Sequence, residues 1–288
     1  PQGAGVHAVS LPERHQFAHG EVRVQIQGPE DGRPVLMIPG LTYPLEVWGP
    51  VADRLSTDGN RVVTFDLYGR GQSDWDGVSL DTATQAEQAL AIMDQVGFRG
   101  GVNVVSLSTS DLIALWLAAA VPERIRTVAL VAPTGVDPRT QRGSVGVSNQ
   151  PWLRGISSAL MARRLLRRMK AHQAVLPSDA EPLSIAAFEA AFDSLQHNPN
   201  VGRAVLSHMA NWPSIEEVRG TLSVLNDLRI PTTAVTYGQE TEDGVQPFET
   251  LTHVRRLFVS EAGQGPITQS QATVGALLQH FTGRRRTP

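Results

Sequence analysis

Residues 106–133, SLSTSDLIALWLAAAVPERIRTVALVAP, decide the fold. A short apolar run, Val102 to Val105, precedes them, and a second run, Val128 to Val131, lies near their end. Between the runs, Leu112 to Ala120 is strongly apolar and stops before Pro122, which is typical of a buried helix. Two short apolar runs joined through a helix predict parallel strands that are covered on both faces. The stretch therefore predicts a strand, a tight turn, a helix and a second strand.

The same alternation extends in both directions from this stretch. Further strands are predicted at 22–27, 35–38, 62–65, 232–236 and 257–259, and further helices at 82–96 and 274–281. Residues 1–20 carry no clear pattern and are expected to be an extended lead-in, while Gly28 to Gly32 is expected to be a hairpin loop. Strands that alternate with helices predict a doubly wound, mostly parallel α/β sheet.

The alternation stops between residues 135 and 226, where the apolar positions keep a helical period and no strand-like run occurs. We therefore expect a core domain made of residues 1–134 and 227–288. Residues 135–226 are expected to form a helical cap that is inserted into this core and folds over the sheet. The basic residues at 163–170 are expected to lie on a solvated helix face of that cap.

Composition excludes several classes of protein. Of 288 residues, 41% are hydrophobic and 18% charged, which indicates a globular chain with a sizeable core. The net charge of −3 argues against nucleic acid as a partner, and the absence of cysteine excludes thiolate catalysis and cysteine-bound metals. No apolar run approaches a membrane span, and we expect a cytoplasmic protein. Metal, P-loop and dinucleotide motifs are missing, so no cofactor is expected; the oligomeric state stays open.

The turn at the start of the deciding stretch carries the chemistry. A strand that enters a helix through a G-x-S-x-G turn lifts the hydroxyl of the central serine above the edge of the sheet. Glycine flanks that serine because side chains would crowd the turn. Here the central residue is Ser108, and the flanking positions hold Ser106 and Ser110, which are the next smallest polar choice.

Residues 106–133 resemble the elbow, helix and following strand of the α/β-hydrolase superfamily. Four more stretches resemble that family in its own order: the oxyanion loop and first helix (IPGLTYPLEVWGPVADRL), the segment after the next strand (FDLYGRGQSD), the acid-bearing strand end (PTTAVTYGQETED) and the histidine loop (VSEAGQGP). The resemblance covers roughly residues 22–282 and implies the α/β-hydrolase fold. It also implies that Asp66 and Arg70 hold the loop after their strand.

The roles that the resemblance implies describe a degraded triad. Ser108 falls at the nucleophile, Gln264 at the general base and Thr241 nearest the acid, although Glu240, Glu242 or Asp243 could supply a shifted acid. A carboxamide cannot take a proton at neutral pH, and serine is a poor nucleophile without a base. The backbone N–H groups of Leu41 and Thr109 fall at the oxyanion hole, where donors work without triad side chains.

The remaining candidates are side chains expected to contact a small-molecule substrate. Asp111 is either a first-turn helix acid or a buried carboxylate that acts as a base. His208 is the one histidine that we nominate as a replacement base, with ordinary packing as the alternative. Aromatic and polar side chains complete the set of expected substrate contacts: Thr42, Tyr43, Asp111, Trp152, His208, Trp212 and Thr241.

These residues predict a cofactor-independent enzyme that does not hydrolyse its substrate. It would be a cyclase, isomerase or lyase that shapes a largely apolar small molecule, such as a polyketide-like secondary metabolite, and polarises its carbonyl group. Two alternatives stay open: a serine hydrolase or acyltransferase that uses Ser108 with a base not yet located, and a binding protein without turnover. Labelling of Ser108 by a fluorophosphonate separates the serine hydrolase from the other two.

Overall fold

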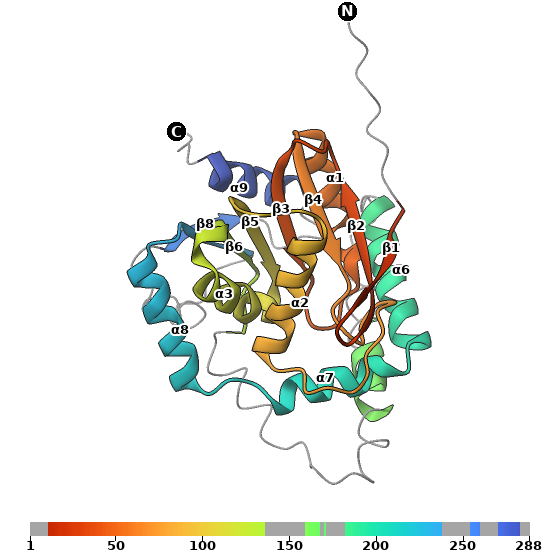
Figure 1. The fold of residues 1–288 in the computed structure, drawn as a ribbon. Helices are drawn as coiled ribbons and strands as arrows, with labels where there is room; N and C mark the ends of the chain where they lie inside the picture. The colour runs from red at the N-terminus through yellow and green to blue at the C-terminus, as the bar shows by residue number, and fades with distance from the viewer. Residues whose placement is uncertain are drawn as a thin grey trace, which may run out of the picture.

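A computed structural model describes residues 11–135, 159–167, 170, 182–237, 254–259 and 270–282. The strands it contains form one sheet with the order β1-β2-β4-β3-β5-β6-β7-β8 (Figure 1). β1 and β2 pair antiparallel, β2 pairs antiparallel with β4, and every other pair is parallel. The strands are β1 (Glu13–Phe17), β2 (Gly20–Gln27), β3 (Arg33–Ile38), β4 (Asn60–Phe65), β5 (Val102–Leu107), β6 (Ile125–Val131), β7 (Thr232–Tyr237) and β8 (Val254–Val259).

Helices lie on both faces of this sheet. They are α1 (Gly49–Thr57), α2 (Thr82–Gln95), α3 (Asp111–Ala120), α6 (Pro182–His197), α7 (Asn200–Ala210), α8 (Ile215–Leu228) and α9 (Ser270–Thr282). Short 3-10 turns add η1 (Leu45–Trp48), η2 (Ser108–Ser110) and η3 (Pro122–Arg124). None of the described helices is both long and apolar enough to cross a membrane.

Successive side chains of the strands point alternately into two separate hydrophobic cores. Leu36 and Ile38 of β3 point into a core that also takes side chains from α2, α3 and α8. Their neighbours Val35 and Met37 point into a second core, built with α1, α6 and α9. Successive side chains of a strand face opposite sides of a sheet, so strands covered on both faces are apolar throughout. Helix α7 contributes Ala204 to the first core and Val201 and Val205 to the second.

The structure confirms the doubly wound, mostly parallel α/β sheet. Each predicted strand lies within an observed strand, and each helix predicted in the core matches an observed helix, although α2 ends one residue before the predicted end at 96. Two expectations are wrong. Residues 13–17 of the supposed lead-in form the edge strand β1. The loop at Gly28 to Gly32 is not a hairpin, because β4 lies between β2 and β3. A Cβ on Gly28 would meet the Asn60 carbonyl at 2.0 Å, which places the loop across the start of β4.

The segment expected to form the cap contains only helices within its described residues. In Figure 1, α6 and α7 lie near the red and orange end of the sheet, and α8 lies outside α3. Three buried side chains of α8, Val218, Leu222 and Leu225, belong to the core shared with α2 and α3. The division into a core and a cap at residues 135 and 226 stays a prediction, but α8 packs as part of the core.

Candidate active site

The elbow between β5 and α3 places Ser108 in a strained backbone conformation. Its φ is +55°, in the left-handed region that side chains other than glycine rarely adopt. Such a conformation costs on the order of 1 kcal/mol or more and is found mainly where function requires it. The Ser108 Oγ lies 3.0 Å from the Thr134 Oγ1 just after β6, and either hydroxyl can donate. Ser108 thus stands on a sharp turn with another hydroxyl as its partner.

The two serines at the glycine positions of the elbow differ in their surroundings. Both are buried, with exposed fractions of 0% for Ser106 and 1% for Ser110. The Ser110 Oγ donates a 2.6 Å hydrogen bond to the Pro39 carbonyl, which joins the elbow to the loop after β3. The Ser106 Oγ finds no hydrogen-bond partner among the described residues. Serine therefore fits at both positions, but only Ser110 contributes a contact.

The loop after β3 lies beside the elbow because Ile38 and Ser106 are paired in the parallel ladder. The Tyr43 N–H donates to the Gly40 carbonyl at 3.0 Å, and in a trans peptide this directs the Leu41 N–H to the opposite side. Within the described parts of the chain, the Leu41 N–H donates to no acceptor. Thr109 lies in the first turn of a helix, where backbone N–H groups lack intrahelical acceptors. Two backbone donors are thus held at one edge of the sheet.

Arg70 fastens this loop to the neighbouring elements. Its side chain is 1% exposed and donates to three carbonyls: Tyr68 at 2.8 Å, Leu41 at 3.3 Å and Ala204 of α7 at 3.3 Å. Burial lowers the pKa of Arg70 to about 9. The guanidinium thus fixes the backbone on the carbonyl side of Leu41 and links it to α7.

The buried carboxylate of Asp66 also holds this region in place. It accepts from the Leu45 N–H at 2.7 Å and the Gln72 N–H at 2.8 Å, and it lies 3.7 Å from Arg23. Burial raises the pKa of Asp66, while the charge of Arg23 and these backbone donors oppose that rise. These contacts match the expected role of Asp66 and Arg70 in holding the loop.

Asp111 is fully buried at the start of α3. Its Oδ1 accepts from the Leu112 N–H at 2.7 Å, and its Oδ2 accepts from the Gly135 N–H at 2.8 Å. The carboxylate thereby stabilises the first turn of the helix and the backbone that follows Thr134. Of the two expected interpretations, these contacts favour the helix acid, and they also position the hydroxyl that contacts Ser108.

His208 lies on α7 and is 2% exposed. Its Nδ1 lies 2.5 Å from the Gln85 Nε2 of α2, and its ring meets the Trp212 ring edge-on at 5.1 Å. Burial lowers the pKa of His208 to about 3, and the charge of Arg70 adds to this shift. His208 is therefore a neutral packing residue between two helices. The structure records no contact between His208 and Ser108.

The other described histidines also have partners away from the elbow. His15 and His19 lie near Glu13 and Asp76, His197 bonds to Asp193, and His280 bonds to Thr233. No imidazole is hydrogen-bonded to Ser108 within the described parts of the chain. Three predicted site residues, Trp152, Thr241 and Gln264, lie outside the described residues. Their places in the site therefore stay predictions.

The sequence analysis missed the contact that Thr134 makes with Ser108. A signal for it was present, because Thr134 follows the apolar run of β6 and the carboxyl ends of parallel strands meet at one edge of a sheet. Of the predicted substrate contacts, Thr42 and Tyr43 lie on the loop after β3, close to the elbow. Trp212 lies on the α7–α8 connection and lines a pocket between α2, α3 and α8.

Comparisons with known proteins identify the fold family of the chain. A family model described as alpha/beta hydrolase fold matches residues 33–240, which is more than half of the chain. The non-heme chloroperoxidase of Streptomyces lividans is 29% identical over 105 residues, or 36% of this chain. That match spans 38% of the length of the chloroperoxidase.

Solved structures share the fold over nearly the whole chain. The thioesterase domain from the curacin biosynthetic pathway has a TM-score of 0.64 and 20% identity, and the alignment covers 96% of this chain and 99% of that domain. The enol-lactonase from Burkholderia xenovorans LB400 has a TM-score of 0.66 and 17% identity, over 91% of this chain and 97% of that enzyme. At these identities the likeness concerns the fold alone.

Proposed function

The chain belongs to the alpha/beta hydrolase fold family. We propose that it uses the backbone N–H groups of that family's oxyanion hole to polarise a substrate carbonyl, but has no histidine base to take the proton of the serine. On this proposal it is a cofactor-independent cyclase, isomerase or lyase that acts on a largely apolar small molecule. A polyketide-like secondary metabolite with a carbonyl group is the substrate class that we favour. The proposal includes a cytoplasmic location and the expected contacts from Thr42, Tyr43, Trp152 and Thr241.

The proposal rests on the resemblance of residues 259–266 to the family's histidine loop, which implies that Gln264 stands where the family's histidine would stand. The contacts of Ser108 support it, because the hydroxyl has Thr134 as its partner and no described histidine bonds to it. His208 is also a poor substitute, since a group with a pKa of about 3 is a weak base at neutral pH. Without a base, the serine hydroxyl is a hydrogen-bond partner more than a nucleophile.

The proposed mechanism relies on the backbone donors. A substrate carbonyl oxygen would accept from the N–H groups of Leu41 and Thr109, which makes its carbon more electrophilic. A hydroxyl of the same substrate molecule could then add to that carbon. The new C–O bond forms, the carbonyl π pair moves to the carbonyl oxygen, and the O–H bond of the adding hydroxyl breaks as its proton passes to that oxygen. Holding the two groups together can supply about 7–11 kcal/mol of the barrier, and the product is an isomer of the substrate.

Serine hydrolysis remains the second candidate function. The left-handed backbone of Ser108 favours it, since this strain is costly for a residue whose side chain has no role. The relatives described above are named as a thioesterase, a lactonase and a chloroperoxidase. Under this alternative, a base from outside the described residues would have to reach the Ser108 hydroxyl.

Four proteins separate the two candidates: the parent chain, Ser108→Ala, Gln264→Ala and Gln264→His. Each is incubated with p-nitrophenyl butyrate and with a fluorophosphonate probe. We expect the parent chain to hydrolyse the ester no faster than Ser108→Ala and to resist labelling. Gln264→His should restore a base and raise hydrolysis by about 100-fold or more, with labelling of Ser108.

The positive activity is tested by incubating the chain with hydroxy-carbonyl polyketide fragments and analysing the products by mass spectrometry and NMR. An isomer of unchanged mass, formed by the parent chain and lost in Gln264→Ala, supports the proposal. Labelling of Ser108 in the parent chain, with ester turnover that Ser108→Ala abolishes, would establish the serine hydrolase instead.

A further inference from the structure

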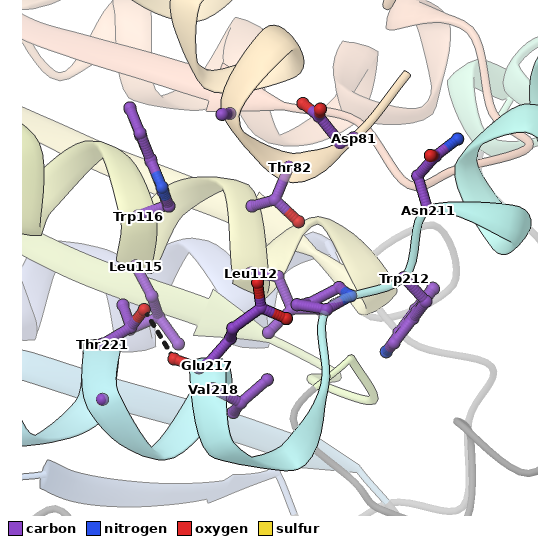
Figure 2. Close-up of a pocket in the computed structure, with 13 residues that line it drawn as sticks. Asp81, Thr82, Leu112, Leu115, Trp116, Asn211, Trp212, Glu217, Val218 and Thr221 are labelled. Atoms are coloured by element: carbon purple, nitrogen blue, oxygen red, sulfur yellow. Dashed lines mark hydrogen bonds between the residues drawn. The ribbon is translucent and has the colours of Figure 1, made fainter. Parts of the chain in front are cut away.

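A pocket lies between the start of α2, one face of α3 and the start of α8 (Figure 2). Its volume is about 530 Å³, within the range of about 300–1,000 Å³ that small-molecule sites occupy. Leu112 and Leu115 of α3 and Val218 of α8 form its apolar floor and are nearly completely buried. The space is therefore large enough for an organic molecule of one ring and a short chain.

Two indole rings flank this space. Trp116 comes from α3 and Trp212 from the α7–α8 connection, and Figure 2 shows them on opposite sides of the lining residues. Both rings are only half-buried, because they pack on the core with part of their surface uncovered. The face of an indole ring attracts cations through its quadrupole, and tryptophan does so more strongly than tyrosine or phenylalanine.

The charged side chains among the described residues that line the pocket are acidic. They are Asp81 and Glu217, and the described lining contains no arginine, lysine or histidine. Neither carboxylate forms an ion pair with the described residues. Figure 2 shows the Glu217 carboxylate and the Thr82 hydroxyl turned toward the space between α2 and α8. The lining thus combines negative charge with aromatic surface.

Both carboxylates also cap helices, so the partial positive charge of each helix N-terminus offsets part of the negative charge at the pocket. The Asp81 Oδ1 accepts from the Thr84 N–H at 2.7 Å, and the Glu217 Oε2 accepts from the Ser214 N–H at 2.7 Å. Each helix N-terminus contributes roughly +0.5 of a charge, against a full negative charge on each carboxylate. About one negative charge therefore remains at the pocket, and one oxygen of each carboxylate is left over from the capping bond.

Two lining side chains end in polar atoms that lack partners. The Thr82 Oγ1 and the Trp212 Nε1 are buried, and neither has a hydrogen-bond partner among the described residues. Buried polar atoms nearly always find a partner in protein, water or ligand. The Thr82 Oγ1 and the Trp212 Nε1 are therefore available to hydrogen-bond with water or with a bound molecule.

We propose that this pocket binds an organic cation: an amine or quaternary ammonium compound with an aromatic or aliphatic body. The ammonium group lies near the carboxylates of Asp81 and Glu217, and the body lies on Leu112 and Leu115 between the indole rings. The site is separate from the function proposed for Ser108. None of the residues that contact Ser108 or hold the loop after β3 is among the described residues that line the pocket.

The probe for this site is 2-phenylethylammonium, with 2-phenylethanol as its neutral counterpart and 3-phenylpropanoate as an anion of similar size. Dissociation constants are measured by NMR titration of the full chain at pH 7. We expect the cation to bind at least about fivefold more tightly than the alcohol, and the anion to bind more weakly than the alcohol. Raising the salt concentration should weaken only the binding of the cation, because salt screens charge.

Variants locate the site without disturbing the helix caps. Glu217→Gln removes the charge while glutamine can still complete the capping box of α8, and Asp81→Asn removes the charge while asparagine still caps α2. We expect each to weaken the binding of the cation about threefold to fivefold. The matched control is Glu216→Gln, which makes the same charge change on the same helix turn outside the pocket. Glu216→Gln and Ser108→Ala should leave the affinity unchanged.

The result that supports the proposal is a preference for the cation that falls in Glu217→Gln and Asp81→Asn but not in Glu216→Gln. Three results overturn it: equal affinity for the cation and the alcohol, no saturable binding of the cation, or equal losses in Glu217→Gln and Glu216→Gln. Loss of binding in Ser108→Ala would also overturn it, because the probe would then occupy the elbow.

Discussion

Ser106 and Ser110 occupy the two positions that flank Ser108 in the elbow, but their hydroxyl groups differ in hydrogen bonding. The Ser110 hydroxyl bonds to the Pro39 carbonyl, whereas the Ser106 hydroxyl is buried without a partner among the described residues. Ser110→Ala should therefore lower the free energy of unfolding by about 1 kcal/mol or more, because the buried carbonyl loses its donor. Ser106→Ala should leave it unchanged or raise it. Urea unfolding of the two variants measures the difference, and equal losses would contradict the structure.

At Gly71 the side chain of Asp66 approaches the backbone so closely that only glycine fits. The φ of Gly71 is +53°, and a Cβ there would lie 2.2 Å from the carboxylate of Asp66. Gly101 has a similar φ of +66° but open space around it. Gly101→Ala should cost about 1–2 kcal/mol from backbone strain, and Gly71→Ala clearly more, since it also displaces a buried carboxylate. The midpoint of thermal unfolding tests this order; a Gly101→Ala loss as large as that of Gly71→Ala would contradict it.

At the scale of residues, sequence reasoning located the elbow but not its contacts. The motif around Ser108 predicted a tight turn, and the strained backbone of Ser108 agrees with it. The position of Thr134 after β6 places it at the same edge of the sheet as Ser108, but the bond itself depends on side-chain orientation, which spacing does not encode. The link from Arg70 to α7 joins residues 134 positions apart, and nothing local to Arg70 predicts it.

Secondary structure elements were predicted well where the pattern is apolar and poorly where it is not. Runs such as residues 35–38 are apolar on both faces because helices cover them, and this signal is strong. Strand β1 is an edge strand whose residues, Glu13 to Phe17, are mostly exposed, so burial imposes no alternation on it. The Gly28 to Gly32 loop has the composition of a turn, but composition does not say which strand becomes the neighbour.

Helix α8 yields a prediction about where the core ends. Leu222 is 3% exposed in the core with α2 and α3, whereas Val224 on the same helix is 44% exposed. Leu222→Ala should lower the free energy of unfolding by about 2–4 kcal/mol, because it leaves a cavity in the core. Val224→Ala is the matched control and should change it by less than about 0.5 kcal/mol.

Urea unfolding followed by circular dichroism measures both variants of α8. If the helix is part of the core, Leu222→Ala shifts a single cooperative transition. A variant that instead unfolds α8 separately, with the main transition unchanged, would place α8 in an independent cap and restore the predicted boundary at residue 226.

In the part of the chain that the structure describes, one sheet lies between two cores, and each core has a buried histidine close to it. His208 packs between α2 and α7, and His280 bonds to Thr233 at 2.8 Å on the side of α9. Burial lowers the pKa of His208 to about 3 and that of His280 to about 4. Both rings therefore stay neutral in the folded protein over the pH range in which the histidines of an unfolded chain take up protons.

This arrangement predicts that acid destabilises the fold as a whole. Below pH 6.5 the unfolded chain binds protons at both histidines and the folded chain does not, so stability is full above about pH 7 and falls as the pH decreases. At pH 5 each histidine should account for a loss of about 2 kcal/mol. The measurement is the free energy of unfolding in urea between pH 7.5 and pH 5. His208→Gln should flatten this dependence by about half. If the free energy of unfolding depends on pH equally in the parent chain and in His208→Gln, His208 is accessible to protons in the folded state. His208 would then again be a candidate base.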